Sequence, residues 1–143
     1  MHRMETIVCR NGIRDEFIFD NFINRMKLES LKDFYNEILE MSNQQLRKLS
    51  TGTLDEKAIM SLVDFQKRVY DSLAEIDAAF VAIDGFEDKM NKQYMDVNDK
   101  NYAIDTNVSR CIIDTIMDKL DKGFVQRIPT EYEEVPLSEA DKW

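Results

Sequence analysis

The sequence predicts an all-α protein, a small helical bundle with three to four main helices. Only four glycines and two prolines occur in 143 residues, and both prolines fall in the last fifteen. Apolar residues recur at spacings of three and four along most of the chain, which is typical of amphipathic helices. With 43% apolar residue types, a chain of this length supports one domain around one core.

We expect a helical domain over residues 1–123 and an extended acidic arm over residues 124–143. At the start, Thr6–Arg10 is rich in β-prone residues, and Asn11-Gly12 is a dipeptide favoured in two-residue hairpin turns. Residues 1–14 are therefore expected to be extended, or to form a hairpin with a return strand over 13–19. The helical spacing of the apolar residues after Asp15 favours a helix there rather than the return strand.

The next helices are expected over residues 31–49 and about 54–83. Thr53 and Glu56 have the spacing of a capping box, so they mark the expected start of the longer helix. Gly85 is expected to end or bend it. Phe86 and the residues after it would then form a further short helix.

The long helix carries a seam of apolar residues in alternating steps of three and four, interrupted by Gln66. A seam of this kind predicts a coiled-coil-like contact, either with the helix over 31–49 or with another subunit. Its members are Ile59, Leu62, Val69, Leu73, Ile76, Phe80 and Ile83.

Asp96 to Asn107 is expected to be a polar connection, followed by a last helix that closes at Gly123. The apolar face of that helix is predicted to contain Val108, Cys111, Ile112, Ile116 and Leu120. The arm after it contains Pro129 and Pro136, which lack the amide proton that a helix needs. Such a tail either packs on its own domain or is held by another chain.

The net charge of −9 lies in the later part of the chain. Residues 1–50 hold eight basic and eight acidic side chains, whereas residues 51–143 hold eleven and twenty. Six acids and no base lie between Asp71 and Asp88. Nucleic-acid affinity depends on neutralising phosphates with Lys and Arg, so we expect no direct nucleic-acid binding.

Candidate partner-binding residues come from this acidic run and from the arm. They are Asp71, Glu75, Asp77, Asp84, Tyr132, Leu137 and Trp143. The aromatic residues Phe17, Phe19 and Phe22 add a further candidate, because helical geometry cannot bury all three on one narrow face.

We expect no catalytic, cofactor-binding or metal-ligating residues. The single histidine, His2, provides neither a zinc set nor a nucleophilic triad. Glu37 and Glu40 place two carboxylates on one helix face, as in all-α magnesium-dependent nucleotide hydrolases, but the second acidic pair of those enzymes is absent. We expect a solvated helix face there.

Cys9 and Cys111 lie far apart in the sequence, and no secretory signal or membrane-spanning apolar run is visible. We therefore expect reduced, buried thiols, a cytoplasmic location and no membrane partner.

These observations favour a non-enzymatic helical interaction or assembly protein, which self-associates or docks through the 59–83 seam and the arm. A second hypothesis is an acidic inhibitor that mimics nucleic acid in a basic groove of a target protein. A third hypothesis, ranked after these, is a magnesium-dependent nucleotide hydrolase built on Glu37 and Glu40. By architecture alone, phage-type assembly factors, such as head–tail adaptors and small terminase subunits, are a further alternative, because they share a plan of short helices and an extended arm.

Overall fold

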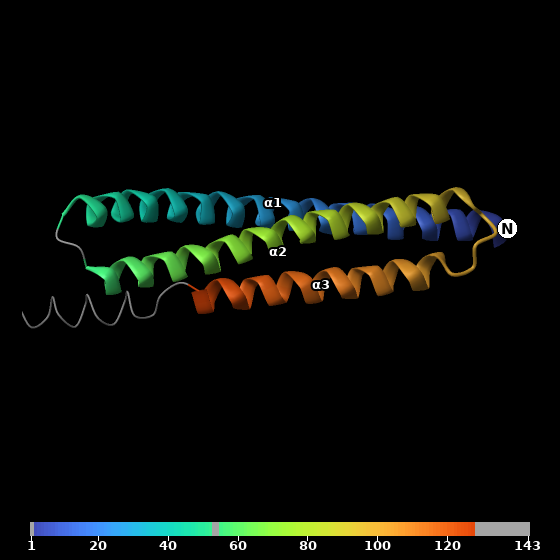
Figure 1. The fold of residues 1–143 in the computed structure, drawn as a ribbon. Coiled ribbons are helices and arrows are strands. Elements are labelled where there is room, and N and C mark those ends of the chain that lie inside the picture. Colours follow the sequence, from blue (N-terminus) through green and yellow to red (C-terminus); the bar gives the residue numbers. More distant parts are fainter. Residues whose placement is uncertain (1, 53–54, 128–143) are drawn as a thin grey trace, which may run out of the picture.

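The computed structural model describes the backbone of residues 2–52 and 55–127, and the side chains of residues 10–52 and 55–124. It is an all-α bundle of three helices, α1 (His2–Thr51), α2 (Glu56–Met95) and α3 (Tyr102–Arg127). The helices lie side by side in an elongated rod, with α2 antiparallel to α1 and α3 (Figure 1). The expected all-α bundle of three to four main helices is confirmed by the three described helices, but their boundaries differ from those expected and the helices are longer.

Helix α1 runs without interruption through the segment that we expected to be extended or a hairpin. The predictions of a strand over 6–10, a turn at Asn11-Gly12 and separate helices from 15 and from 31 are wrong. The reason is a seam that repeats with heptad spacing from Arg10 to Ser42, so that one face of this stretch packs against the other two helices. Its buried members include Arg10, Phe17, Asn21, Leu28, Tyr35 and Ser42.

Helix α2 begins two residues later than the predicted capping box indicated. Its N-cap is Asp55, whose carboxylate accepts a hydrogen bond from the backbone N–H of Ala58 at 3.2 Å. Thr53, the expected cap, lies outside the described residues. The helix does not end or bend into a new helix at Gly85 but continues to Met95.

The predicted seam of α2 packs inside the protein's own bundle. Val69, Ile76 and Ile83 are buried, and Leu73 and Phe80 pack half-buried against the same core. The interruption at Gln66 also has a partner within the chain, because its side-chain amide donates to Ser42 Oγ at 2.8 Å and Asn43 Oδ1 at 2.7 Å. The seam therefore joins α2 to its neighbours, as in the first of the two contacts predicted for it. The prediction that the seam docks on another protein is wrong for its buried residues.

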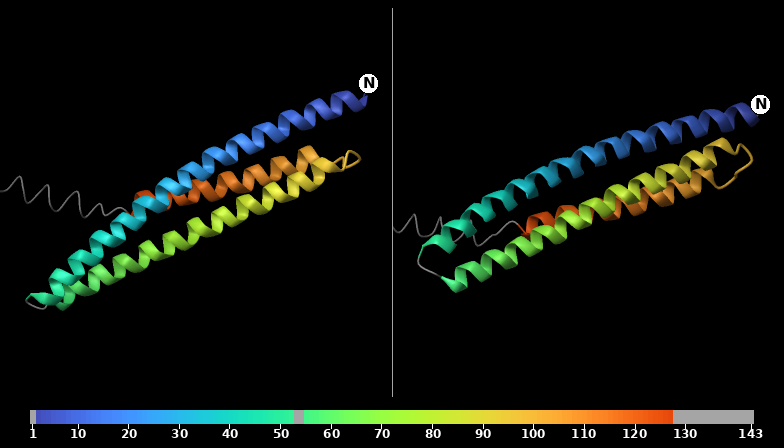
Figure 2. Two further views of the ribbon diagram at one scale, coloured as in Figure 1. Left: turned by 90° about the horizontal axis from the view of Figure 1, so that it is seen from above. Right: turned by 45° about the horizontal axis from the view of Figure 1, so that its top comes forward.

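Helix α3 runs alongside both other helices (Figure 2). It begins at Tyr102, so the polar connection is shorter than expected, and it continues past Gly123 to Arg127. Phe124, expected in the arm, packs with its ring centroid 5.2 Å from that of Phe34 and 5.8 Å from that of Tyr35. Residues 128–143, which contain the rest of the predicted arm, lie outside the described residues.

One buried arginine holds the connection between α2 and α3. The Arg10 guanidinium donates to the carbonyl oxygens of Gln93 at 3.0 Å and Asp96 at 2.9 Å, and also to that of Asp99. It lies 4.9 Å from the centre of the Tyr102 ring. Its charge thus faces the negative end of the α2 dipole and an aromatic face, which compensates for its burial.

Replacing Gly85 by alanine should stabilise the protein. Gly85 lies inside α2 without a positive φ, and an added Cβ would meet no atom within 4 Å. Alanine has the higher helix propensity, so we expect the free energy of unfolding to rise by about 0.5–1 kcal/mol. Urea denaturation followed by circular dichroism measures this change. An unchanged or lower stability would show that the glycine has a role in α2 that its geometry does not reveal.

Replacing Arg10 by methionine should destabilise the protein. Methionine keeps an apolar stem but removes the guanidinium hydrogen bonds to the carbonyls of Gln93, Asp96 and Asp99, so we expect a loss of about 2 kcal/mol in the free energy of unfolding. Arg47→Met, at an exposed position of α1, is the matched control and should change the stability by less than about 0.5 kcal/mol. Equal effects of the two substitutions would contradict the role of Arg10.

Tyr102 should make the protein less stable at alkaline pH. Burial raises the pKa of its hydroxyl above the usual value of 10.0. The folded state therefore keeps this proton to higher pH than the unfolded state, and its contribution to stability is lost as the pH rises above about 10. Tyr102→Phe removes this effect. Between pH 9 and 11 the stability of the variant should fall less steeply than that of the wild type, whereas parallel curves would contradict the assignment.

Candidate functional site

Two of the predicted acidic partner-binding residues form ion pairs within the bundle. Asp84 Oδ1 lies 2.7 Å from Arg25 Nη2, and Asp77 Oδ1 lies 3.2 Å from Lys32 Nζ. Glu87 also pairs with Arg25. These contacts join the acidic run of α2 to basic residues of α1, so part of that run has a structural partner.

Burial and these ion pairs shift the pKa of the Arg25 guanidinium in opposite directions. Burial lowers the pKa of its guanidinium, but the hydrogen bonds and charges of Asp84 and Glu87 raise it more, so the net shift is upward. Arg25 therefore keeps its charge over the whole working pH range.

The remaining candidates are distributed over the surface or lie beyond the described residues. Asp71 is exposed and Glu75 is half-buried on α2. The arm candidates are not among the described residues; they are Tyr132, Leu137 and Trp143. The structure thus brings no two of the predicted partner-binding residues together in one described pocket.

The carboxylates Glu37 and Glu40 are both exposed on α1. Among the described residues, no three His, Cys, Asp or Glu side chains are grouped so that they could hold a metal ion. No helix within residues 2–52 and 55–127 has the apolar length needed to cross a bilayer.

The aromatic residues of α1 divide between the core and the surface. Phe17 is 1% exposed, whereas Phe19 is 62% and Phe22 58% exposed. With the exposed Met26, the latter two form a strip at spacings of three and four, which we call the α1 apolar face. Large exposed apolar side chains that gather in one strip are typical of interaction sites.

A groove between α1 and α3 adjoins the α1 apolar face at Met26. Its apolar lining comes from both helices, and its charged lining has both signs. The lining residues are Ile23, Met26, Lys27, Ser30, Leu31, Met117, Asp118 and Asp121. The face and the groove together offer a surface with an apolar centre and a polar rim.

Helix α3 has a second apolar strip, which the sequence pattern merged with the core. Ile116 is half-buried and Leu120 is buried, as expected, but Val108, Cys111 and Ile112 are exposed. The prediction that Cys111 is a buried thiol is also wrong; Cys111 is a free, exposed cysteine. The side chain of Cys9 is outside the described set.

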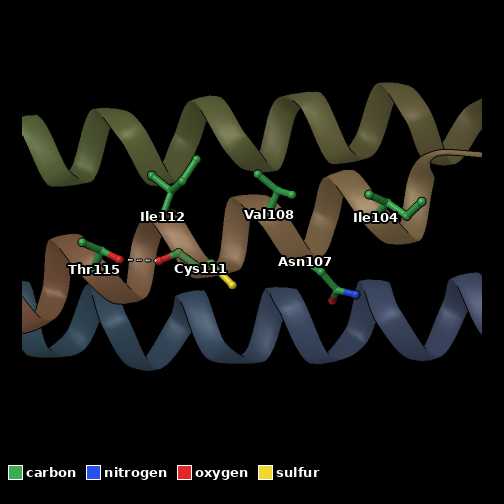
Figure 3. Close-up of a pocket in the computed structure, with 6 residues that line it drawn as sticks. All are labelled: Ile104, Asn107, Val108, Cys111, Ile112 and Thr115. Atoms are coloured by element: carbon green, nitrogen blue, oxygen red, sulfur yellow. Dashed lines mark hydrogen bonds between the residues drawn. The ribbon is translucent and has the colours of Figure 1, made fainter.

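The exposed strip lines an open surface of α3 (Figure 3). Ile104, Val108 and Ile112 point toward the α2 side, and Cys111 points toward the α1 side. Thr115 continues the strip and donates its hydroxyl proton to the carbonyl of Cys111 at 2.9 Å. Ile104 was expected in the polar connection and not on this strip. The step of four from Ile104 to Val108 was the available signal.

The exposed apolar strips lie on helices without net charge. Helix α1 has eight basic and eight acidic residues, and α3 has four of each. Helix α2, with five bases and eight acids, accounts for a part of the net −9. Electrostatic repulsion therefore opposes docking least at α1 and α3.

No family model, no curated protein and no solved structure matches this chain.

Proposed function

We propose that this protein is a non-enzymatic helical interaction or assembly protein, and that its α1 apolar face binds an amphipathic helix of another protein. The observation that carries the proposal is the exposure of Phe19, Phe22 and Met26 on one strip of a neutral helix. Aromatic residues and methionine are enriched in protein interfaces, and exposed aromatic side chains supply much of the binding energy there.

The neighbouring groove supports a helix as the occupant. A partner helix would place apolar residues on the α1 apolar face and between Leu31 and Met117, in the manner of helix-in-groove recognition. Lys27 on one side and Asp121 on the other offer ion pairs to a helix with both signs of charge on its flanks. This combination fits a helix better than an extended basic peptide.

The alternatives receive less support. An acidic inhibitor would present the 71–88 carboxylates to a basic groove, but Asp77 and Asp84 already pair with α1. The analogy with phage-type assembly factors relied on short helices, whereas the helices here have 50, 40 and 26 residues. We therefore rank the helix-binding function first.

The double substitution Phe19→Ser and Phe22→Ser tests the proposal. Cross-linking in the native host identifies proteins bound to the wild-type chain, and titration with the purified partner measures the affinity. We expect the double variant to weaken binding at least tenfold, because the two rings form the centre of the surface. The helical content should not change, since both side chains are outside the core.

Val81→Ser is the matched control, because Val81 is 71% exposed on α2, away from the α1 apolar face. It should bind like the wild type. A partner that binds both variants equally, or a partner surface without a helix, would contradict the proposal. Loss of binding on neutralising Asp71 and Glu75 would instead favour the acidic inhibitor.

A further inference from the structure

The exposed strip of α3 has the spacing of a coiled-coil seam. Ile104, Val108, Cys111 and Thr115 follow one another in steps of four, three and four, and Ile112 flanks them. We call these five residues the α3 outer seam. It lies on the opposite side of the helix from the buried series, which is Tyr102, Thr106, Ser109, Ile113 and Leu120. Helix α3 is therefore apolar on two faces, of which the bundle uses one.

The outer seam has defined limits. Asp118 and Lys122 would be its next two positions, but they form an exposed ion pair with each other at 2.9 Å. The seam thus spans twelve residues, from Ile104 to Thr115, or about 17 Å of helix. The helix that carries it has no net charge, so two α3 helices do not repel each other, although each whole chain carries a net charge of −9.

We propose that the α3 outer seam binds the same seam of a second copy of this chain, with the two α3 helices parallel and in register. This interaction uses a different surface from the α1 apolar face, so it does not depend on the function proposed above. It would pair two bundles along their length and place the two α1 apolar faces on one dimer.

Charge complementarity sets the orientation. In a parallel coiled coil, residues that flank the seam meet residues five positions further along the other helix. This spacing pairs Asp114 with Lys119 of the second copy, twice in a symmetric dimer; both residues are exposed on α3. An antiparallel pair on the same seam places Asp114 opposite Asn107 and leaves Lys119 beyond the seam. The parallel arrangement therefore gains two ion pairs that the antiparallel one lacks. It also brings the two copies of Asp118 near each other beyond the last apolar layer, where each is already paired with Lys122 of its own helix.

The size of the seam sets the expected strength. Four seam layers bury less area than the roughly 1,000 Å² or more of stable interfaces. Because α3 is already folded and fixed in the bundle, association has less conformational entropy to overcome. We expect a reversible dimer with a dissociation constant between about 1 and 100 μM.

Cross-linking through Cys111 tests the proposal directly. In a full-length Cys9→Ser background, Cys111 is the remaining thiol, and a parallel dimer brings the two copies of it face to face. Mild oxidation at 100 μM protein should give a disulfide-linked dimer. This concentration is of the order of 100 times the lower limit that we expect for the dissociation constant. In the same background, Val108→Asp should slow its formation at least tenfold, because it places like charges within the seam.

The matched control moves the thiol to an exposed apolar position off the seam. Val81→Cys in a Cys9→Ser and Cys111→Ser background should not form the dimer above the rate of random collision. Sedimentation equilibrium of the wild-type chain under reducing conditions provides a second measurement that does not depend on Cys9→Ser folding. It should show a concentration-dependent dimer that Val108→Asp weakens by the same factor.

A charge exchange tests the orientation. Lys119→Asp alone should weaken the dimer, and the combination of Asp114→Lys with Lys119→Asp should restore it, because the parallel pairs form again with their signs reversed. Conversely, cross-linking between Ile104→Cys and Thr115→Cys chains, both in the background without native thiols, would show an antiparallel pair and overturn the parallel arrangement.

Three results would overturn the self-association itself. These are a chain that stays monomeric at 100 μM, a cross-linking rate no greater than that of the Val81→Cys control, and a dimer that survives Val108→Asp but is lost with Phe19→Ser and Phe22→Ser. The last result would assign the dimer to the α1 apolar face. Loss of partner binding with an intact α3 dimer would instead contradict only the helix-binding function.

Discussion

The bundle depends on the continuity of one packing pattern along each helix. In α1 the buried positions advance by four and three from Arg10 to Ser42, and α2 and α3 have matching series centred on Ile76 and Ile113. A constant pattern keeps the same face of each helix toward its neighbours over many turns. Breaks in the local sequence, such as Gly12 and Gly85, therefore do not end the helices. The free energy that each glycine costs, about 1 kcal/mol, is small beside the packing of the helix in which it lies.

The long-range periodicity of apolar residues correctly predicted which face of α2 is buried. Helix boundaries were predicted wrongly where a short local signal, such as a glycine, disagreed with that periodicity. Val69, Ile76 and Ile83 were identified as one seam and are buried together. The turn at Asn11-Gly12 and the stop at Gly85 were wrong, because a dipeptide or a single glycine contains no information about packing partners. In α3, residues of two opposite faces satisfy helical spacing equally well, so the pattern alone could not separate Val108 from Leu120.

The candidate interaction surfaces were also predictable from the sequence only in part. Helical geometry indicated that Phe17, Phe19 and Phe22 could not all be buried, but which ring faces the core depends on the register of α1 against the other helices. The acidic run on α2 was visible in the sequence, whereas its pairing with Arg25 and Lys32 was not, since those residues lie 45 to 59 positions away. Tertiary contacts thus pair Asp77 and Asp84 with α1 while both side chains stay exposed to solvent.

The unequal lengths of the helices give the described rod two mechanically different ends. Phe124, near the end of α3, lies beside Phe34 and Tyr35, and α1 continues beyond that level to Thr51, where it packs against the first turns of α2. Three helices share any bending load along one stretch, and two share it along the other (Figure 1). Resistance to bending rises steeply with cross-section. A lateral force on this molecule would therefore be absorbed at the α1–α2 hairpin, while the stretch that carries both apolar strips would keep its shape.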